Sequence, residues 1–280
     1  MSLFIASLNS GSNGNCYYIG NQDEAILIDA GLSCRETERR MKRLELSMKK
    51  LKAIFVSHEH SDHIYGVSSL SRKHKLPVYV TGSTMKEGRL RLKENLAIPF
   101  RAHEPVALGS LSVTAFPIFH DATDPHNFVV TSNSVNVGVF TDIGQPSEHV
   151  TRHFEQCHAA FLEANYDEEM LETGSYPVSL KDRIKGGNGH LSNTQAMQLF
   201  LNHRPEFMSH LFLSHLSENN NSPKIVSKLF SGVAGKTEII IASRHKETRL
   251  YHIRNLPGFK NQVVRISGKA PEVQLSLFNQ

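Results

Sequence analysis

The sequence contains no tryptophan, few cysteines and no long apolar run. Its three cysteines, Cys16, Cys34 and Cys157, form no C-x-x-C pair, and an odd number gives no disulfide framework. No apolar run reaches the ~20 residues that cross a membrane. The first seven residues also lack the basic start and apolar core of a signal peptide. These absences predict a protein of the reducing cytoplasm without contact to a membrane.

Histidine is the residue type in excess, with 16 copies among 280 residues. The apolar fraction of 39% is ordinary and allows a sizeable core. The net charge of +4 is modest and indicates an anionic partner without proving one. Composition does not shift before about residue 256. We therefore expect one α/β catalytic domain over residues 1–255 and a looser tail over 256–280.

The densest chemistry lies in residues 57–63, directly after the apolar run 53–56, which is a predicted strand. An extended backbone sends the first two histidines of this stretch to one side. A helix that begins near Ser61 turns the last aspartate and histidine toward a neighbouring point. Such a pattern suits two adjacent divalent cations, zinc or manganese, and makes a polar loop with chance histidines improbable. The candidate ligands are His58, His60, Asp62 and His63.

Further metal-ligating residue types follow other predicted strands. Singly, each is more typical of loop chemistry, but strand ends are the usual place for site residues in α/β folds. Asp29 ends the apolar run 25–28 and is either a turn residue or an acceptor that orients a ligating histidine. The others are His120, Asp142, Glu163 and His215.

The polar loop 9–15 permits two interpretations. It is either a hairpin connection or a backbone nest whose N–H groups meet a phosphate. Candidate phosphate contacts are Ser10, Ser12, Asn13 and, at the start of a predicted helix, Asn193.

Two basic segments add to the anion-binding potential. A helix is predicted over 33–46 with Ser33 as its N-cap, and it carries five lysines and arginines. A second basic segment covers 86–93. Basic helices are usually solvated faces, but the early helix can also follow a nucleic-acid backbone without reading sequence.

The ordered set H-x-H-x-D-H, His120, Asp142 and His215 resembles the metallo-β-lactamase fold superfamily over about residues 1–255. The resemblance implies an α/β fold, an αββα sandwich with the site along one edge. It also implies a first metal held by His58, His60 and His120, a second held by Asp62, His63 and His215, and Asp142 as the bridge. The redox branch has glutamate at the place of His60, so His60 favours the hydrolytic branch.

Within the superfamily, the segments 8–15, 189–193 and 213–220 resemble the WalJ/YycJ-type DNA exonucleases. RNA-processing relatives of the β-CASP group carry a large insertion, and the 47 residues between Asp142 and His190 are too few for it. The resemblance implies a DNA exonuclease that uses two divalent metals, zinc or manganese, cuts from 5′ to 3′ and acts in replication or repair. Asp62 would also orient the attacking water, and His190 would contact the scissile phosphate or protonate the leaving group.

Three alternatives remain open. A small-ester or thioester hydrolase could use the same metal centre, but it would not need His190 or the basic segments. An RNA-processing nuclease would share the site. A metal-stabilised binding protein without catalysis is disfavoured because all seven ligand types are present.

The tail carries a short motif, Gln-Leu-Ser-Leu-Phe, at residues 274–278. It resembles the peptide by which replication and repair proteins dock on the bacterial sliding clamp. In that mode Gln274 bonds at the pocket rim, while Leu275, Leu277 and Phe278 fill an apolar cleft. The alternative is a last strand or strap that packs on the protein's own surface. The motif favours DNA over RNA as the substrate.

Overall fold

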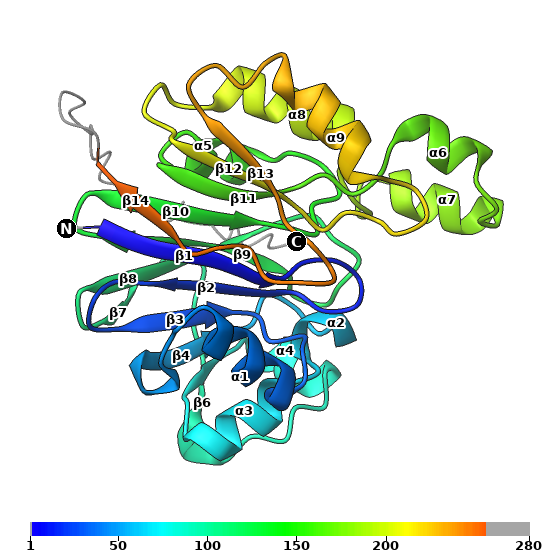
Figure 1. The fold of residues 1–280 in the computed structure, drawn as a ribbon. Helices are drawn as coiled ribbons and strands as arrows, with labels where there is room; N and C mark the ends of the chain where they lie inside the picture. The colour runs from blue at the N-terminus through cyan, green and yellow to red at the C-terminus, as the bar shows by residue number, and fades with distance from the viewer. Residues whose placement is uncertain (1, 256–280) are drawn as a thin grey trace, which may run out of the picture.

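The computed structural model describes residues 2–255, and the clamp-like motif lies outside this range. Two seven-stranded sheets pack face to face (Figure 1). The first sheet has the order β14-β1-β2-β3-β4-β5-β6. Its strands are β1 (Ser2–Asn9), β2 (Cys16–Gly20), β3 (Ala25–Ile28), β4 (Leu51–Phe55), β5 (Val78–Tyr79), β6 (Ala97–Ile98) and β14 (Tyr251–Arg254).

The second sheet has the order β13-β12-β11-β10-β9-β8-β7. It is antiparallel from β7 to β10 and parallel from β10 to β13. Its strands are β7 (Val106–Leu108), β8 (Leu111–Pro117), β9 (His126–Ser132), β10 (Val135–Phe140), β11 (Ala159–Glu163), β12 (His210–Ser214) and β13 (Glu238–Ile241).

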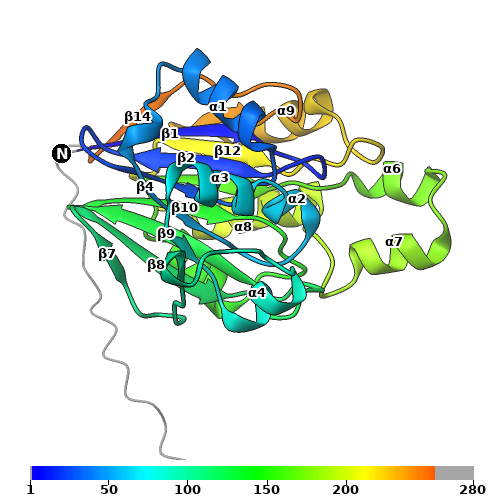
Figure 2. The same cartoon turned by 90° about the horizontal axis from the view of Figure 1, so that it is seen from below.

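Helices cover the outer face of each sheet, as Figures 1 and 2 show from two directions. On the first sheet these are α1 (Cys34–Arg43), α2 (Ser61–Ile64), α3 (Val67–His74) and α4 (Gly82–Glu87). On the second they are α5 (Glu148–Phe154), α8 (Asn193–His203) and α9 (Pro223–Ser231), while α6 (Glu168–Thr173) and α7 (Val178–Lys185) project from one end. Two 3-10 turns, Met48–Lys50 and Glu94–Leu96, complete the described elements.

Strand β11 shows why the layers form. All five of its residues are buried, and alternate side chains point to opposite faces of the sheet. Phe161 packs between the sheets, 4.6 Å from the Phe212 ring centroid, whereas Leu162 packs against the outer helices. One apolar layer therefore lies between the sheets and another beneath each set of helices. The predicted αββα sandwich is confirmed.

Capping side chains set the starts of two predicted helices. The Ser33 hydroxyl accepts from Glu36 N, so α1 begins at Cys34. Ser192 and Gln195 form a reciprocal capping box at the start of α8. Within residues 2–255, no helix combines the length and apolarity needed to cross a membrane.

One backbone crossing fixes the loop after β3 against α2. Gly31 N donates to Asn15 O at 2.9 Å, and Asn15 N donates to Asp62 O at 2.7 Å. A Cβ atom on Gly31 would lie 1.6 Å from Asp62 O, far inside contact distance. Only glycine lets these three backbone segments approach so closely.

We expect Gly31→Ala to lower the free energy of unfolding by at least about 2 kcal/mol, because the added methyl group meets rigid backbone. Gly82→Ala is the matched control. A Cβ at Gly82 meets nothing within 4 Å, and alanine is the better helix former. Urea denaturation of both variants measures the difference. Equal stability of the two variants would contradict the crossing.

Candidate metal centre

The candidate ligands meet where strands of both sheets end. The stretch 57–63 follows β4, and His215 directly follows β12. Three residues at these ends have left-handed backbone: Asp29 with φ 58°, Asp142 with φ 57° and His215 with φ 56°. This conformation is strained for residues with a Cβ and is concentrated at functional sites. The sheet edge therefore combines these polar residues with left-handed backbone.

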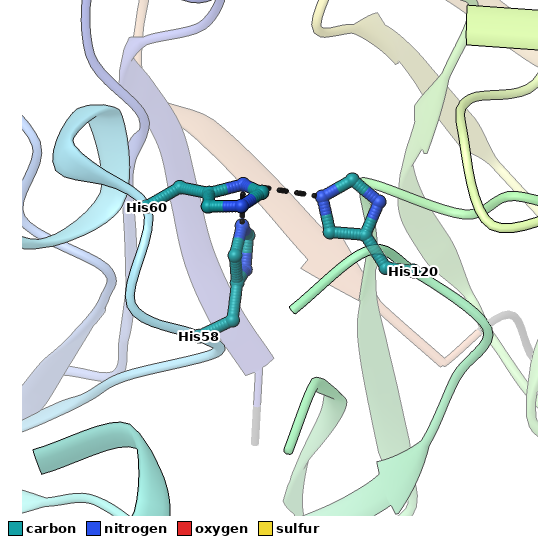
Figure 3. Close-up of side chains that lie close together, drawn as sticks. All are labelled: His58, His60 and His120. Atoms are coloured by element: carbon teal, nitrogen blue, oxygen red, sulfur yellow. Dashed lines mark hydrogen bonds between the residues drawn. The ribbon is translucent and has the colours of Figure 1, made fainter. Parts of the chain in front are cut away.

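Three histidines direct ring nitrogens at one point (Figure 3). His60 Nδ1 lies 3.1 Å from His58 Nε2 and 3.3 Å from His120 Nε2. Ligand atoms at 2.0–2.1 Å from a tetrahedral zinc ion are about 3.3 Å apart. The spacing of these nitrogens thus fits one metal ion.

A second group adjoins the first. His63 Nε2 lies 3.4 Å from Asp62 Oδ2 and 3.2 Å from Asp142 Oδ2. His215 Nε2 lies 3.4 Å from Asp62 Oδ2. Asp142 faces both groups, because its Oδ1 lies 3.9 Å from His120 Nε2. All seven candidate ligands of the sequence are therefore brought together.

The second ring nitrogens reveal where the imidazole protons lie. His120 Nδ1 donates to Gly189 O at 3.0 Å, since a carbonyl can only accept. The Ser57 hydroxyl donates to Asp29 Oδ2 and is left to accept from His58 Nδ1 at 2.9 Å. In a neutral imidazole, a donor at one nitrogen leaves a lone pair at the other. The inward nitrogens of His58 and His120 thus carry lone pairs, as metal ligands must.

The electrostatics of the group favour positive charge. Burial lowers the pKa of His58 and, less strongly, that of His120, so both rings stay neutral. Burial also opposes a charge on His63, yet Asp142, Asp62 and Asp29 outweigh it and raise its pKa. The same balance raises the pKa of His215 to about 10. The carboxylates thus keep protons on His63 and His215, at positions where metal ions can take the place of those protons.

Asp142 supplies a direct test of fit. Burial alone would raise the pKa of its carboxyl, but His215 and His63 hold it well below its usual range. Its Oδ2 is buried and makes no hydrogen bond of good geometry. An ionised, unsatisfied oxygen is costly inside a protein unless a cation faces it. The donor set around this carboxylate therefore fits divalent cations.

Asp29 and Ser57 hold the outer side of the site. Asp29 Oδ2 accepts from His63 Nδ1 at 2.7 Å, and Asp29 Oδ1 accepts from Ser57 N at 2.8 Å. A carboxylate behind a ligating histidine fixes its ring and raises its basicity. The geometry is the one expected for the orienting role of Asp29.

His190 lies beside the seven residues and bonds to Glu163, a strand-end carboxylate that the sequence singled out but that is not one of the seven ligands. Its Nδ1 is 2.7 Å from Glu163 Oε1, which is also 3.2 Å from His215 Nδ1. Burial lowers the pKa of His190, but Glu163 and Asp142 outweigh burial and raise it. Glu163 Oε2 accepts from Ile143 N at 2.7 Å, which holds the carboxylate in place. Glu163 thus links His190 to the metal group.

Two residues missed at the sequence level, Asn15 and Asn165, act from loops. Asn15 Nδ2 donates to Asp62 Oδ2 at 3.0 Å, and its Oδ1 accepts from Gly11 N. Asn165 Nδ2 donates to His215 O at 2.9 Å. For Asn15, the only available signal was its place in the polar loop 9–15.

The expected phosphate contacts are separated by the structure. Ser12 lines a pocket together with Asp121, Arg183 and His190. Asn13 Nδ2 donates to Arg244 O. Ser10 is buried, and its hydroxyl accepts from His215 N at 2.7 Å. Asn193 is buried and exchanges hydrogen bonds with Asn221. Of this set, Ser12 is the residue at the pocket.

Three arginines of the basic helix α1 make contacts within the protein. Arg40 is buried and donates to Leu8 O at 2.8 Å and to Asn9 Oδ1 at 2.7 Å. Arg39 pairs with Glu36, and Arg43 pairs with Glu247. The expectation that this helix follows a nucleic-acid backbone therefore needs correction for Arg40, which is a structural residue.

Comparisons with known proteins identify the family. The model of the beta-lactamase superfamily domain matches residues 24–215. Exodeoxyribonuclease YycJ of Bacillus anthracis is 34% identical over 236 residues, 83% of this chain and 89% of that protein. Exodeoxyribonuclease WalJ of Streptococcus pneumoniae is 31% identical over 219 residues, 76% of this chain and 81% of that protein.

The fold agrees with this match. The crystal structure of the metallo-beta-lactamase fold protein YhfI from Bacillus subtilis superposes with a TM-score of 0.69 at 18% identity. The alignment covers 90% of this chain and 99% of that one. These comparisons confirm the resemblance seen in the sequence: the chain belongs to the beta-lactamase superfamily, with the YycJ and WalJ exodeoxyribonucleases among its relatives.

Proposed function

We propose that this protein is a metal-dependent exodeoxyribonuclease that hydrolyses phosphodiester bonds from 5′ to 3′ in DNA replication or repair. The convergence of three imidazole nitrogens and a neighbouring Asp62–His63–His215 group around Asp142 carries the proposal. Two relatives that are more than 30% identical are named exodeoxyribonucleases, which favours DNA over RNA and over small esters. The three free cysteines suit the cytoplasmic location that we also propose.

Seven residues would hold two divalent cations, zinc or manganese, with Asp142 between them. When bound, such a pair supplies Lewis-acid charge to the phosphodiester and lowers the pKa of a water molecule. Carboxylate content shifts the preference of the second group toward manganese. The proposed ligands are His58, His60 and His120 for one ion and Asp62, His63 and His215 for the other.

Asp62 has a second task in this proposal. Its side chain is partly open to the site, and Asn15 holds its Oδ2 from one side. A carboxylate in that position can accept a hydrogen bond from the attacking water and orient it toward phosphorus. The water oxygen then bonds to phosphorus while its proton passes to the Asp62 carboxylate, and the opposite phosphorus–oxygen bond breaks.

His190 is the proposed donor for the leaving oxygen. Its Nδ1 is engaged by Glu163, so Nε2 remains for the pocket that His190 lines. Because Glu163 favours the protonated ring, the imidazolium is available to contact the scissile phosphate and to give its proton to the departing alkoxide. The products are a phosphate monoester and an alcohol. The attacking water loses one proton, and the leaving oxygen gains one from His190.

Asp62→Ala tests the metal mechanism. We expect the wild-type chain to degrade 5′- and 3′-labelled single- and double-stranded DNA after metal is restored to chelated protein. The variant should show no turnover, with DNA affinity within several-fold of the wild type, because it loses a ligand and the orienting carboxylate. Asp182→Ala, which removes an exposed carboxylate on α7, is the control and should keep full activity. RNA cut faster than DNA would support the RNA-processing alternative. Near-wild-type turnover by Asp62→Ala would reject the mechanism.

His190→Ala should lower the rate on phosphodiesters by roughly 10²-fold or more, the usual scale for a positioned proton donor. Metal content, measured by elemental analysis, should stay at two ions per chain. His203→Ala removes a surface imidazole paired with Glu155 and should change neither quantity. A fall to one ion per chain would make His190 a ligand instead of a proton donor.

We further propose that the tail recruits the enzyme to a bacterial sliding clamp through Gln274, Leu275, Leu277 and Phe278. The support is the motif alone, since these residues lie outside the described range. Calorimetry with the tail peptide and a clamp should show micromolar-range binding. Changing Leu277 and Phe278 to alanine should remove it, because both fill the apolar cleft, while Asn279→Ala should not. No detectable heat with the native peptide would end the proposal.

A further inference from the structure

We propose that a basic pocket beside α3 is a phosphate-binding site for the DNA strand, at a distance from the scissile bond. The pocket lies between α3 and the segment that precedes the turn Glu94–Leu96. This inference rests on the proposed nuclease function and specifies where its substrate runs. The lining residues are Ser68, Ser71, Arg72, Arg91, Leu92, Lys93 and Leu96.

Three cations of this pocket are uncompensated. In the described part of the chain, Arg72, Arg91 and Lys93 make no ion pair, and all three are exposed. Three arginines of α1 differ, since Arg39, Arg40 and Arg43 each pair with a glutamate. Like charges gathered around one pocket repel each other, and an anion placed among them relieves that repulsion.

A hydroxyl group completes the anion site. Ser68 Oγ accepts from Arg91 N at 3.2 Å, which ties the basic segment to α3. Because its oxygen is the acceptor there, the hydroxyl proton of Ser68 is free to donate to a phosphate oxygen. Ser71 cannot do the same, since its hydroxyl donates to Leu76 O at 2.8 Å. Leu92 and Leu96 add an apolar wall that suits a sugar.

The pocket is within reach of the metal group. Ser68 follows His63 by five residues, so their Cα atoms lie at most about 18 Å apart. Phosphates along one strand of B-DNA rise by about 3.4 Å each, which makes the gap a few nucleotides. Tyr65, 71% exposed, lies between the two in sequence and offers a ring on which a base can stack. These features describe one path from the pocket to the ligands.

The test compares DNA binding across salt concentrations. We would measure fluorescence anisotropy of a labelled single strand with the full-length Asp62→Ala protein, in which turnover is halted. Adding Arg72→Gln and Arg91→Gln should weaken binding roughly tenfold and lower the slope of log K against log salt by about 1.4, or ~0.7 per lost contact. Lysine at both positions should restore the slope, because a phosphate contact needs only the charge. Arg152→Gln, on α5 at the outer face of the other sheet, is the control and should leave the slope unchanged.

A second measurement separates the pocket from the proposed function. In the otherwise wild-type chain, the double glutamine variant should cleave a small diester, bis(p-nitrophenyl) phosphate, at an unchanged rate and a long DNA strand more slowly. An unchanged slope with intact DNA cleavage by the wild type would overturn the pocket alone. A changed slope in a chain that cuts no DNA would overturn the nuclease function and leave the pocket standing.

Discussion

The structure depends on one buried negative charge, the carboxylate of Asp142. Only 2% of this residue is exposed, and it lies between imidazoles supplied by both sheets. A buried carboxylate without cations costs several kcal/mol. This charge raises the pKa values of His63 and His215, so both rings retain protons that balance it. The same buried negative charge makes this sheet edge suitable for divalent ions. One charge therefore governs both the protonation of the histidines and the binding properties of the site.

The backbone contributes to this arrangement as well as the side chains. Asp29, Asp142 and His215 all adopt left-handed backbone just after strands β3, β10 and β12. Each such residue costs about 1–2 kcal/mol relative to the right-handed form. The conformation turns the chain sharply at the point where the strand ends. Asp142 and His215 thereby meet His63 and Asp62 of the other sheet, whereas Asp29 meets Ser57 and His63, which follow β4 of its own sheet. The glycine crossing at Gly31 then clamps the loop after β3 to α2, which carries Asp62 and His63. Strain and close packing together fix the outer carboxylate behind its histidine.

Much of this could be predicted from the sequence because the signals are local. Strand β4 shows as an apolar run, Ser33 caps α1 beside it, and the H-x-H-x-D-H spacing is read directly. The sequence could not predict the hydrogen-bond partner of each polar residue when that partner lies far away in the chain. Glu163 ends an apolar run in the same way as many turn residues do, and only the fold places it beside His190 and His215. Ser10 looked available for phosphate but bonds to His215 N, 205 residues away. Partners at that separation leave no pattern in the chain.

The sequence also does not show which basic side chains are paired within the fold. The unpaired ones indicate where a strand of DNA could bind. In the sequence α1 is the more conspicuous basic element, yet its Arg40 already donates hydrogen bonds to Glu36, Leu8 and Asn9. A cation already held by a carboxylate or a carbonyl has little attraction left for a phosphate, because the substrate must first displace that partner. The segment 89–93 is shorter, but its pocket arginine is tied only through backbone, by Arg91 N to Ser68. Within residues 2–255 its guanidinium makes no ion pair, so the weaker sequence signal marks the cation that is more available to an anion.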